Sequence, residues 1–223
     1  MTTTPGWTDL ATAAPGIRIT HEAARRRHAE GPGADRSWRV GADGEVVVAG
    51  LLSQLTAPTP LERVRGRPGR WRVLHSVPLP RGDGRPSDID HLLVGPPGVV
   101  TINTKHHRRG RVVIDGDDVF VGELATRYVP AARLEGEIAT ALLGAALGRS
   151  GAGALAARLP VRPFVTVVGG ALWVERWPAG VTFTTDHGLV HALRSLPAQL
   201  TVDEVGVVYE QARRSSTWVG GVA

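Results

Sequence analysis

The sequence has 223 residues, of which 42% are hydrophobic, with a formal net charge of +5 and a sequence pI of about 10.8. This length and hydrophobic fraction suffice for one sizeable domain, and the basic balance favours polyanions such as nucleic acids as partners. Cysteine is absent, which excludes disulfides, thiolate zinc sites and cysteine nucleophiles and suits a reducing compartment.

The first 36 residues are predicted to form a flexible basic extension, and residues 37–223 one folded domain. Within the extension, residues 20–30 have the composition of a short basic helix that ends at glycine and proline. No charged segment followed by an apolar stretch marks a secretory signal, and no tract is apolar enough to span a membrane. We therefore expect a cytoplasmic protein without a membrane segment.

From residue 43 onward the chain alternates between helical and strand patterns. Apolar spacing and capping residues predict helices over 43–55, 131–147, 189–196 and 202–214. Short apolar or alternating runs predict strands over 71–79, 88–94, 99–105, 111–114, 119–121, 161–168, 172–174 and 181–184. The mixed order predicts an α/β fold with a core at 41–150 and an α/β continuation at 160–219.

In the first predicted helix, Asp43 is the expected N-terminal cap, and Glu45 would lie in the first turn. The expected apolar stripe of this helix consists of Val47, Leu51, Leu52 and Leu55.

Lys105 is the only lysine in the chain, and the remaining 25 basic residues are arginines. A high genomic GC content would favour arginine everywhere without any functional meaning. However, lysine is a compact charge whose pKa can shift, whereas arginine is a planar group that stays protonated. The position of Lys105, at the end of an apolar run and shortly after Asp88 and Asp90, is that of a metal-dependent phosphodiesterase site.

The strands 88–94 and 99–105 are joined by Gly95-Pro96-Pro97-Gly98, a strong turn signal. This turn places Asp90 opposite Asn103 and Asp88 opposite Lys105. Because side chains alternate along a strand, the four polar groups would share one face, with opposed Cβ atoms about 5 Å apart. The opposite face, which anchors the hairpin on the core, would consist of Ile89, Leu93, Val100 and Ile102.

This arrangement of oxygen ligands suits Mg²⁺ or Mn²⁺, which need few protein ligands when phosphate and water complete the shell. Asp90 and Asn103 would share the cation, which polarises a phosphate and activates water. Lys105 lies one step further along the strand. It would orient the water, act on its proton, or neutralise charge that develops on the phosphate.

Three sequence elements resemble the nuclease-related domain (NERD) family of the PD-(D/E)XK, restriction-endonuclease-like superfamily. They are Asp88-Ile89-Asp90-His91, Gly95-Pro96-Pro97-Gly98 and Ile102-Asn103-Thr104-Lys105, and residues 41–45 resemble the first helix of the family. The resemblance is strongest over 41–121 and weaker up to about residue 218. It implies a restriction-endonuclease-like mixed β-sheet flanked by helices. It also implies nuclease activity with Mg²⁺ or Mn²⁺, on DNA more than on RNA.

Carried over to this sequence, the family pattern implies that Asp90 is the main metal ligand. It further implies that the backbone carbonyl of Thr104 is a second ligand, Lys105 the catalytic lysine and Glu45 an accessory acid.

Asn103 departs from the family pattern, because it stands where the pattern has an acid. The amide offers a neutral oxygen, so the site loses one negative charge, which Asp88 would partly replace as a further metal ligand. Two functions therefore remain open: an active nuclease with Lys105, Asp90, Asn103 and Glu45 as its catalytic set, or a catalytically impaired nucleic-acid-binding module. A third is an interaction domain that recruits partners through its basic N-terminus.

A basic run follows the lysine, and Arg108, Arg109 and Arg111 are expected to contact nucleic acid. His106 and His107, beside them, are expected to be solvated loop residues. His91 falls on the face opposite Asp90 and is expected to pack in the interior.

Several other residues carry weaker signals. Arg127, Arg133 and Glu137 lie in or near the helix 131–147, where the superfamily places phosphate contacts, although exposed helix residues are the commoner explanation. His187 and His191 have a zinc-binding spacing but lack a third ligand, which favours a surface role. Trp173, Trp177 and Trp218 are expected to pack in the core or at sheet edges.

Overall fold

The centre of the fold is a mixed five-stranded sheet, seen in a computed structural model that describes residues 6–17, 36–58, 60–64, 69–80 and 87–219. Its strand order is β1-β2-β3-β7-β9, where the strands are β1 (Arg72–Leu79), β2 (Ser87–Gly95), β3 (Gly98–His106), β7 (Val161–Val168) and β9 (Thr182–Thr185). The first three strands are antiparallel, whereas β3, β7 and β9 are parallel.

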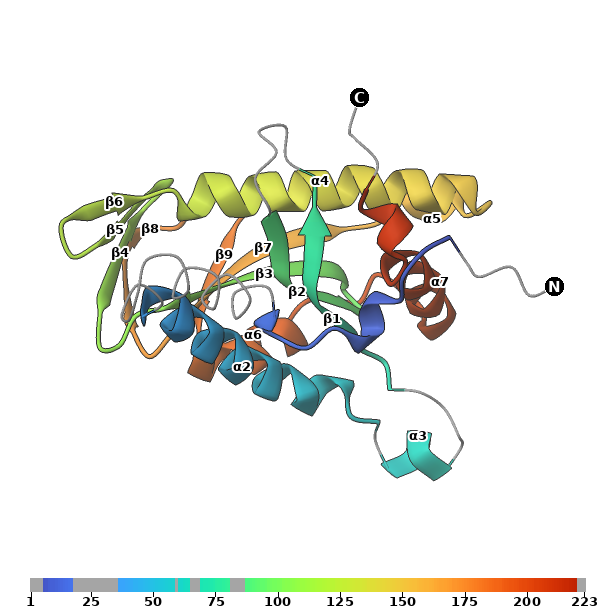
Figure 1. The fold of residues 1–223 in the computed structure, drawn as a ribbon, viewed down its shortest axis with the longest axis horizontal. Helices are drawn as coiled ribbons and strands as arrows, with labels where there is room; N and C mark the ends of the chain where they lie inside the picture. The colour runs from blue at the N-terminus through green and yellow to red at the C-terminus, as the bar shows by residue number, and fades with distance from the viewer. Residues whose placement is uncertain (1–5, 18–35, 59, 65–68, 81–86, 220–223) are drawn as a thin grey trace.

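A second sheet of four strands lies beyond one end of the long helix α4, Tyr128–Arg149 (Figure 1). Its order is β6-β5-β4-β8, with β4 (Arg111–Asp115), β5 (Asp118–Val121), β6 (Leu124–Thr126) and β8 (Ala171–Arg176). The mixed sheets with flanking helices confirm the predicted α/β class and are consistent with a nuclease-like fold.

Helices cover both faces of the large sheet (Figure 1). One face is covered by α2 (Arg36–Thr56) and α6 (Asp186–Arg194), and the other by α4 (Tyr128–Arg149) and α7 (Val202–Ala212). Four short helical segments complete the described chain: η1 (Leu10–Thr12), α3 (Pro60–Val64), α5 (Gly153–Ala156) and η2 (Ser215–Thr217). Among the described residues, none of the helices combines the length and the apolar character that crossing a bilayer requires.

Three hydrophobic clusters hold these layers together. The first joins β1 and β2 to α4 and α7, and the second joins β2, β3 and β7 to α2 and α6. The third lies between the small sheet, the first half of α4, and β7 and β9. Both faces of the central strands are therefore buried near the turn, which explains why residues 92–95 of β2 and 98–102 of β3 are mostly apolar.

The predicted helices and strands are present, with different ends in several cases. Helix α2 begins at Arg36, so Asp43 and Glu45 lie inside the helix, and the predicted cap at Asp43 is wrong. Val48 is buried on its inner face, whereas Val47, predicted to be apolar stripe, is 43% exposed. The elements α3, β6 and α5 had no recognisable sequence signal because each spans five residues or fewer.

Residues 6–17 pack against the C-terminal part of the chain, which the sequence did not predict. The Asp9 carboxylate accepts hydrogen bonds from the Arg213 guanidinium, and the Leu10 amide donates to the Arg213 carbonyl at 2.8 Å. The Thr8 amide donates to Ser215 Oγ at 2.7 Å. The helix expected at residues 20–30 lies outside the described residues.

The three tryptophans do not share one environment. Trp218 is buried and its indole N–H donates to the Ala212 carbonyl at 2.7 Å, as expected for core packing. Trp173 and Trp177 are 55% and 60% exposed and therefore lie outside the core. Trp173 belongs to the edge strand β8, one of the two expected places, whereas Trp177 follows that strand.

The β2–β3 turn is fixed by its surroundings. Gly98 has φ +109°, and a Cβ there would overlap the carbonyl oxygen of Pro160, which accepts a hydrogen bond from Val99 at 2.9 Å. On the other side, the Pro96 carbonyl accepts from the amides of Gln199 and Leu200 at 2.7 and 2.8 Å. These contacts with residues outside the hairpin fix the conformation of the turn, and the turn sets the register of β2 and β3.

Gly98→Ala is expected to lower the free energy of unfolding by about 2 kcal/mol, because alanine meets both an unfavourable φ and a fixed backbone atom. Gly144→Ala, inside α4 where an added Cβ has no neighbour within 4 Å, is the matched control. It should stabilise the protein by about 0.5–1 kcal/mol through helix propensity. Urea denaturation measures both; equal effects of the two substitutions would contradict this account of the turn.

Candidate active site

The candidate site lies where β2 and β3 separate, a place called the fork below. Their paired register runs from Gly95↔Gly98 to His91↔Ile102 and includes Leu92↔Thr101, as predicted from the turn. Beyond it, β2 stays paired with β1 and β3 with β7. Asp90 and Asn103, and likewise Asp88 and Lys105, therefore lie beyond the shared ladder.

Asp90 spans the gap between the separating strands. Its Oδ2 accepts a hydrogen bond from the Thr104 amide at 2.6 Å. A carboxylate oxygen here replaces the backbone carbonyl that a continued ladder would supply. Such a charge-assisted bond fixes the carboxylate at the fork and holds β3 close to β2.

The backbone is also irregular on the other side of Asp90. In β1, Ser76 lies between the pairs His75↔His91 and Val77↔Ile89 and has φ +50°, an uncommon value for a residue other than glycine. Ile89 packs in the same cluster as Leu92, although strict alternation puts them on opposite faces. The expectation that Ile89 shares a face with Leu93 is therefore wrong, because the irregularity changes which side chains point inward.

Glu45 approaches the fork from α2. It is 2% exposed, and its Oε2 accepts a hydrogen bond from the Gly16 amide at 2.9 Å. The neighbouring Gly44 lets the helix lie close to β3, because a Cβ at this position would be 3.0 Å from His106 Cβ and 3.3 Å from Thr104 Cγ2. Because Gly44 has no side chain, α2 can approach β3 closely enough for the buried carboxylate of Glu45 to reach the strand.

Asn103 and Glu135 meet from the other face of the sheet. Asn103 Nδ2 donates to Glu135 Oε1 of α4 at 2.8 Å, and both side chains are 8% exposed. The amide oxygen of Asn103, Oδ1, and the second carboxylate oxygen of Glu135, Oε2, are buried without a hydrogen-bond partner among the described residues. Two oxygen acceptors thus remain unsatisfied beside Asp90.

Lys105 is held by an aromatic side chain. Its Nζ lies 5.3 Å from the centre of the Tyr128 ring, and the Tyr128 hydroxyl is hydrogen-bonded to His107 Nε2 at 2.9 Å. A cation over a tyrosine ring is attracted by the ring quadrupole. The first residue of α4 therefore limits where the ammonium group of Lys105 can lie.

The carboxylates of the site interact with one another electrostatically. Burial, followed by the charges of Asp90 and Asp88, raises the pKa of Glu45 to about 8. Burial, followed by the charge of Asp90, raises the pKa of Glu135 to about 8. Burial also raises the pKa of Asp90 to about 6, although Lys105 and the Thr104 amide act in the opposite direction. Among the described residues, Lys105 is the cation that lowers the pKa of all three acids, and an added cation would stabilise their ionised forms further.

The donor set fits hard divalent cations such as Mg²⁺ and Mn²⁺ better than metals that prefer thiolate or imidazole ligands, such as Zn²⁺. The described residues contain no group of three or more His, Cys, Asp or Glu side chains placed to hold a metal ion. At the fork the oxygens come instead from one carboxylate, one amide and backbone, with the unsatisfied Asn103 Oδ1 among them. Mg²⁺ typically uses one or two carboxylates and takes its remaining ligands from substrate and solvent.

The three arginines expected to contact nucleic acid are exposed and follow β3 on the way into β4. Arg108 lies 3.9 Å from Asp43, and Arg109 has φ +54° and donates its amide to the Gly169 carbonyl at 2.7 Å. The Arg111 guanidinium lies 4.2 Å from the centre of the Trp173 ring. The basic run is therefore an ordered, exposed turn beside the site.

The histidines near the site are structural in this geometry. His91 is fully buried, and its Nδ1 is hydrogen-bonded to His75 Nδ1 at 2.7 Å, as expected for an interior residue. Burial holds the pKa of both rings below the usual range. His106 Nδ1 donates to the Val40 carbonyl at 2.7 Å, and His107 bonds Tyr128. The expectation of solvated loop histidines is wrong for His106 and His107.

The remaining candidates lie outside the fork. Arg133 forms a two-point ion pair with Asp117, with N–O distances of 2.9 and 3.0 Å, while Arg127 and Glu137 are exposed. His187 and His191 are exposed on α6. These positions give no support to a phosphate or zinc role.

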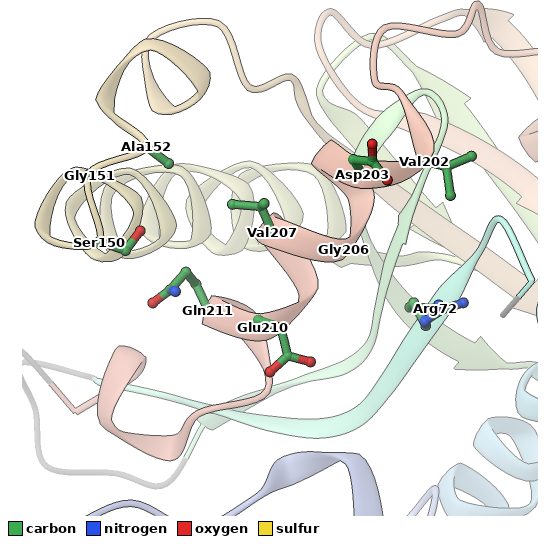
Figure 2. Close-up of a pocket in the computed structure, with 10 residues that line it drawn as sticks. All are labelled: Arg72, Ser150, Gly151, Ala152, Val202, Asp203, Gly206, Val207, Glu210 and Gln211. Carbon is green, nitrogen blue, oxygen red and sulfur yellow. The ribbon is translucent and has the colours of Figure 1, made fainter. Parts of the chain in front are cut away.

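An open cleft of about 950 Å³ lies at the far end of the molecule, between the C-terminal end of α4 and α7 (Figure 2). Its lining includes Arg72 but also the carboxylates of Asp203 and Glu210. The Lys105 site does not contribute to it, and its charge does not favour a polyanion.

A protein-family comparison agrees with this geometry. The family described as nuclease-related domain, NERD, matches residues 40–168, more than half of the chain. This chain belongs to the NERD family. The match contains α2 from residue 40 onward, the β2–β3 fork and α4, so the candidate site residues Glu45, Asp90, Asn103, Lys105 and Glu135 lie inside it. Comparison with curated proteins and with solved structures finds no match.

Glu135 and Tyr128 are the residues of the candidate site that the sequence did not reveal. Buried positions on α4 include Ala132, Glu135, Ala139 and Leu142, at spacings of three or four residues. A carboxylate at a core position of an otherwise apolar stripe was the available signal, since unpaired acids are rarely buried. Glu45 is likewise a buried acid in α2, on a stripe that includes the buried apolar residues Val48 and Leu52.

The raised pKa values predict how stability depends on pH in the absence of metal. Glu135 has a folded pKa of about 8 against an ordinary value of 4.5, so between these values the folded state keeps a proton that the unfolded state releases. Raising the pH through this window should therefore lower the free energy of unfolding, by at most about 1.4 kcal/mol per pH unit for each such group.

Denaturation of the NERD domain in EDTA at several pH values tests this. Glu135→Gln should flatten the decline, because it removes one of the groups with a raised pKa, while Asp90 and Glu45 keep theirs. Glu137→Gln, an exposed position on the same helix, is the matched control and should behave like the unmodified protein. If the free energy of unfolding declined equally steeply with pH in both variants, the assignment of a raised pKa to Glu135 would be contradicted.

Proposed function

We propose that this NERD domain is a nuclease that hydrolyses phosphodiester bonds in DNA with Mg²⁺ or Mn²⁺ as cofactor. Family membership supports a nuclease-related function and contact with nucleic acid. The observation that carries the finer proposal is the fork, where Asp90, Asn103 and Lys105 gather beside two buried acids from opposite faces of the sheet.

The residues divide into those that would hold the cation and those that would act on the reacting groups. Asp90, Asn103 Oδ1 and the Thr104 carbonyl would hold it, with Asp88 as a further oxygen donor. When bound, the cation supplies positive charge that polarises the scissile phosphate and favours attack by water. Glu45 would contribute negative charge from α2 as an accessory acid.

Lys105 would act on the reacting groups. With its ammonium held over the Tyr128 ring, it can orient the attacking water, move a proton, or stabilise charge that develops on the phosphate. A lysine can do all three, whereas an arginine cannot give up its proton.

Cleavage of supercoiled and of single-stranded DNA with Mg²⁺ or Mn²⁺ tests the proposal. Lys105→Ala should lower the rate about 10²- to 10⁴-fold, the usual contribution of a proton-transfer group. Lys105→Arg should also be slow if the proton role dominates, and close to normal if only charge matters. EDTA should abolish cleavage.

Arg149→Ala is the matched control for loss of one positive charge. Arg149 is the last residue of α4, a helix of 22 residues that begins at Tyr128. A helix of that length spans about 33 Å, so this variant should cleave normally. Cleavage that survives Lys105→Ala unchanged would exclude the proposed site.

A second candidate function is a nucleic-acid-binding module of the same fold without turnover. The amide at Asn103, where the family pattern has an acid, favours it. Well-folded protein that binds DNA but does not cut it under any of these metal conditions would support this candidate over the nuclease.

Both candidates use the exposed arginine turn. Arg108→Ala and Arg109→Ala should weaken DNA binding similarly for all sequences, and each should reduce the slope of log affinity against log salt by about 1 if that side chain contacts one phosphate. Arg149→Ala should leave both quantities unchanged. Fluorescence anisotropy over a range of salt concentrations measures them; unchanged slopes for the turn variants would remove this turn from the interface.

A further inference from the structure

The family pattern has an acid at the strand position of Asn103, and in this chain the acid that contacts this position is Glu135 of α4. The strand position, in β3 beside Asp90, holds an amide, while the helix position holds a carboxylate. The two are joined by the 2.8 Å hydrogen bond from Nδ2 to Oε1 and are each more than nine-tenths buried. An aspartate at position 103 would bring two carboxylates to this distance, so the amide is the group that allows the helix acid to be there.

The hydrogen bond leaves two oxygens without partners. Asn103 Oδ1 and Glu135 Oε2 are buried and accept no hydrogen bond from the described residues. Burying such acceptors unsatisfied is costly, and more so for a carboxylate than for an amide. A purely structural pair gains nothing from the charge, because glutamine on the helix could accept the same hydrogen bond from Asn103. The carboxylate and the free amide oxygen are both groups that a divalent cation binds.

We infer that Glu135 supplies the negative charge that the strand lacks, and that the Asn103–Glu135 pair serves as a combined oxygen ligand for the cation at Asp90. The metal-binding charge of this chain has moved from β3 to α4 instead of being lost. This inference rests on the proposed metal dependence but not on turnover, because it concerns binding of the cation.

The test is Mn²⁺ binding by the full chain, measured by isothermal titration calorimetry without nucleic acid. Glu135→Gln keeps the shape and the acceptor for Asn103 but removes the charge, and should weaken Mn²⁺ binding about 10- to 100-fold. The double variant Asn103→Asp with Glu135→Gln returns the acid to the strand, and the new helix amide can donate to it. This exchange should restore most of the affinity.

Glu137→Gln is the control, since it removes an exposed carboxylate two residues away on the same helix. It should bind Mn²⁺ like the unmodified protein, and circular dichroism melts should show that all variants fold. Undiminished Mn²⁺ binding by Glu135→Gln would overturn the inference. The inference would also be overturned if the double variant bound Mn²⁺ as weakly as Glu135→Gln alone. An acid on the strand would then not replace the acid on the helix.

The same proteins separate this inference from the proposed function. Mn²⁺ binding that depends on Glu135, without DNA cleavage by the unmodified chain, would support the ligand role and contradict the nuclease. If the unmodified chain cleaves DNA and Glu135→Gln cleaves it equally well, the result would support the nuclease and contradict the ligand role of Glu135. Absence of Mn²⁺ binding by the unmodified chain would overturn both.

Discussion

The hydrogen bond from the Thr104 amide to the Asp90 carboxylate, 2.6 Å long, is the contact on which the candidate site depends. It forms where the β2–β3 ladder ends at His91↔Ile102, while each strand continues with its other neighbour. A side chain thereby satisfies a backbone donor that the sheet itself does not satisfy there. The strands can separate without leaving a buried amide unpaired, and the gap becomes a place for chemistry.

The gap gives helices on both sides of the sheet access to one point. Glu45 reaches it from α2 and Glu135 from α4, although these helices belong to different hydrophobic clusters. The charges of Asp90 and Asp88 raise the pKa of both glutamates in addition to the effect of burial. Protein folds tolerate such local destabilisation mainly at functional sites, where a bound group offsets it. The large clusters around the fork provide the stability that this requires.

Sequence reasoning succeeded where the determining interactions are local. The four-residue turn fixed the register of β2 and β3, and with it the pairing of Leu92 with Thr101, because antiparallel pairing follows directly from the turn. It failed where tertiary packing decides. The position of Glu135 beside Asn103 depends on how α4 docks on the sheet, and the positive φ of Ser76 depends on its neighbours in β1 and β2. Alternation alone therefore put Ile89 on the wrong face.

The site also depends on parts of the chain outside the family match at residues 40–168. Gly16 donates its amide to Glu45, and the segment that contains it is attached through Asp9 to Arg213, after α7. The clusters that hold α2 and α4 on the sheet include Leu189, Leu193, Val205 and Trp218 from the C-terminal third. A carboxylate at the fork is therefore positioned by an interaction between the two ends of the described chain. The fragment that carries the family pattern would lack both the Gly16 hydrogen bond and much of the core beneath its two helices. The functional unit of this protein is thus larger than its recognisable motif.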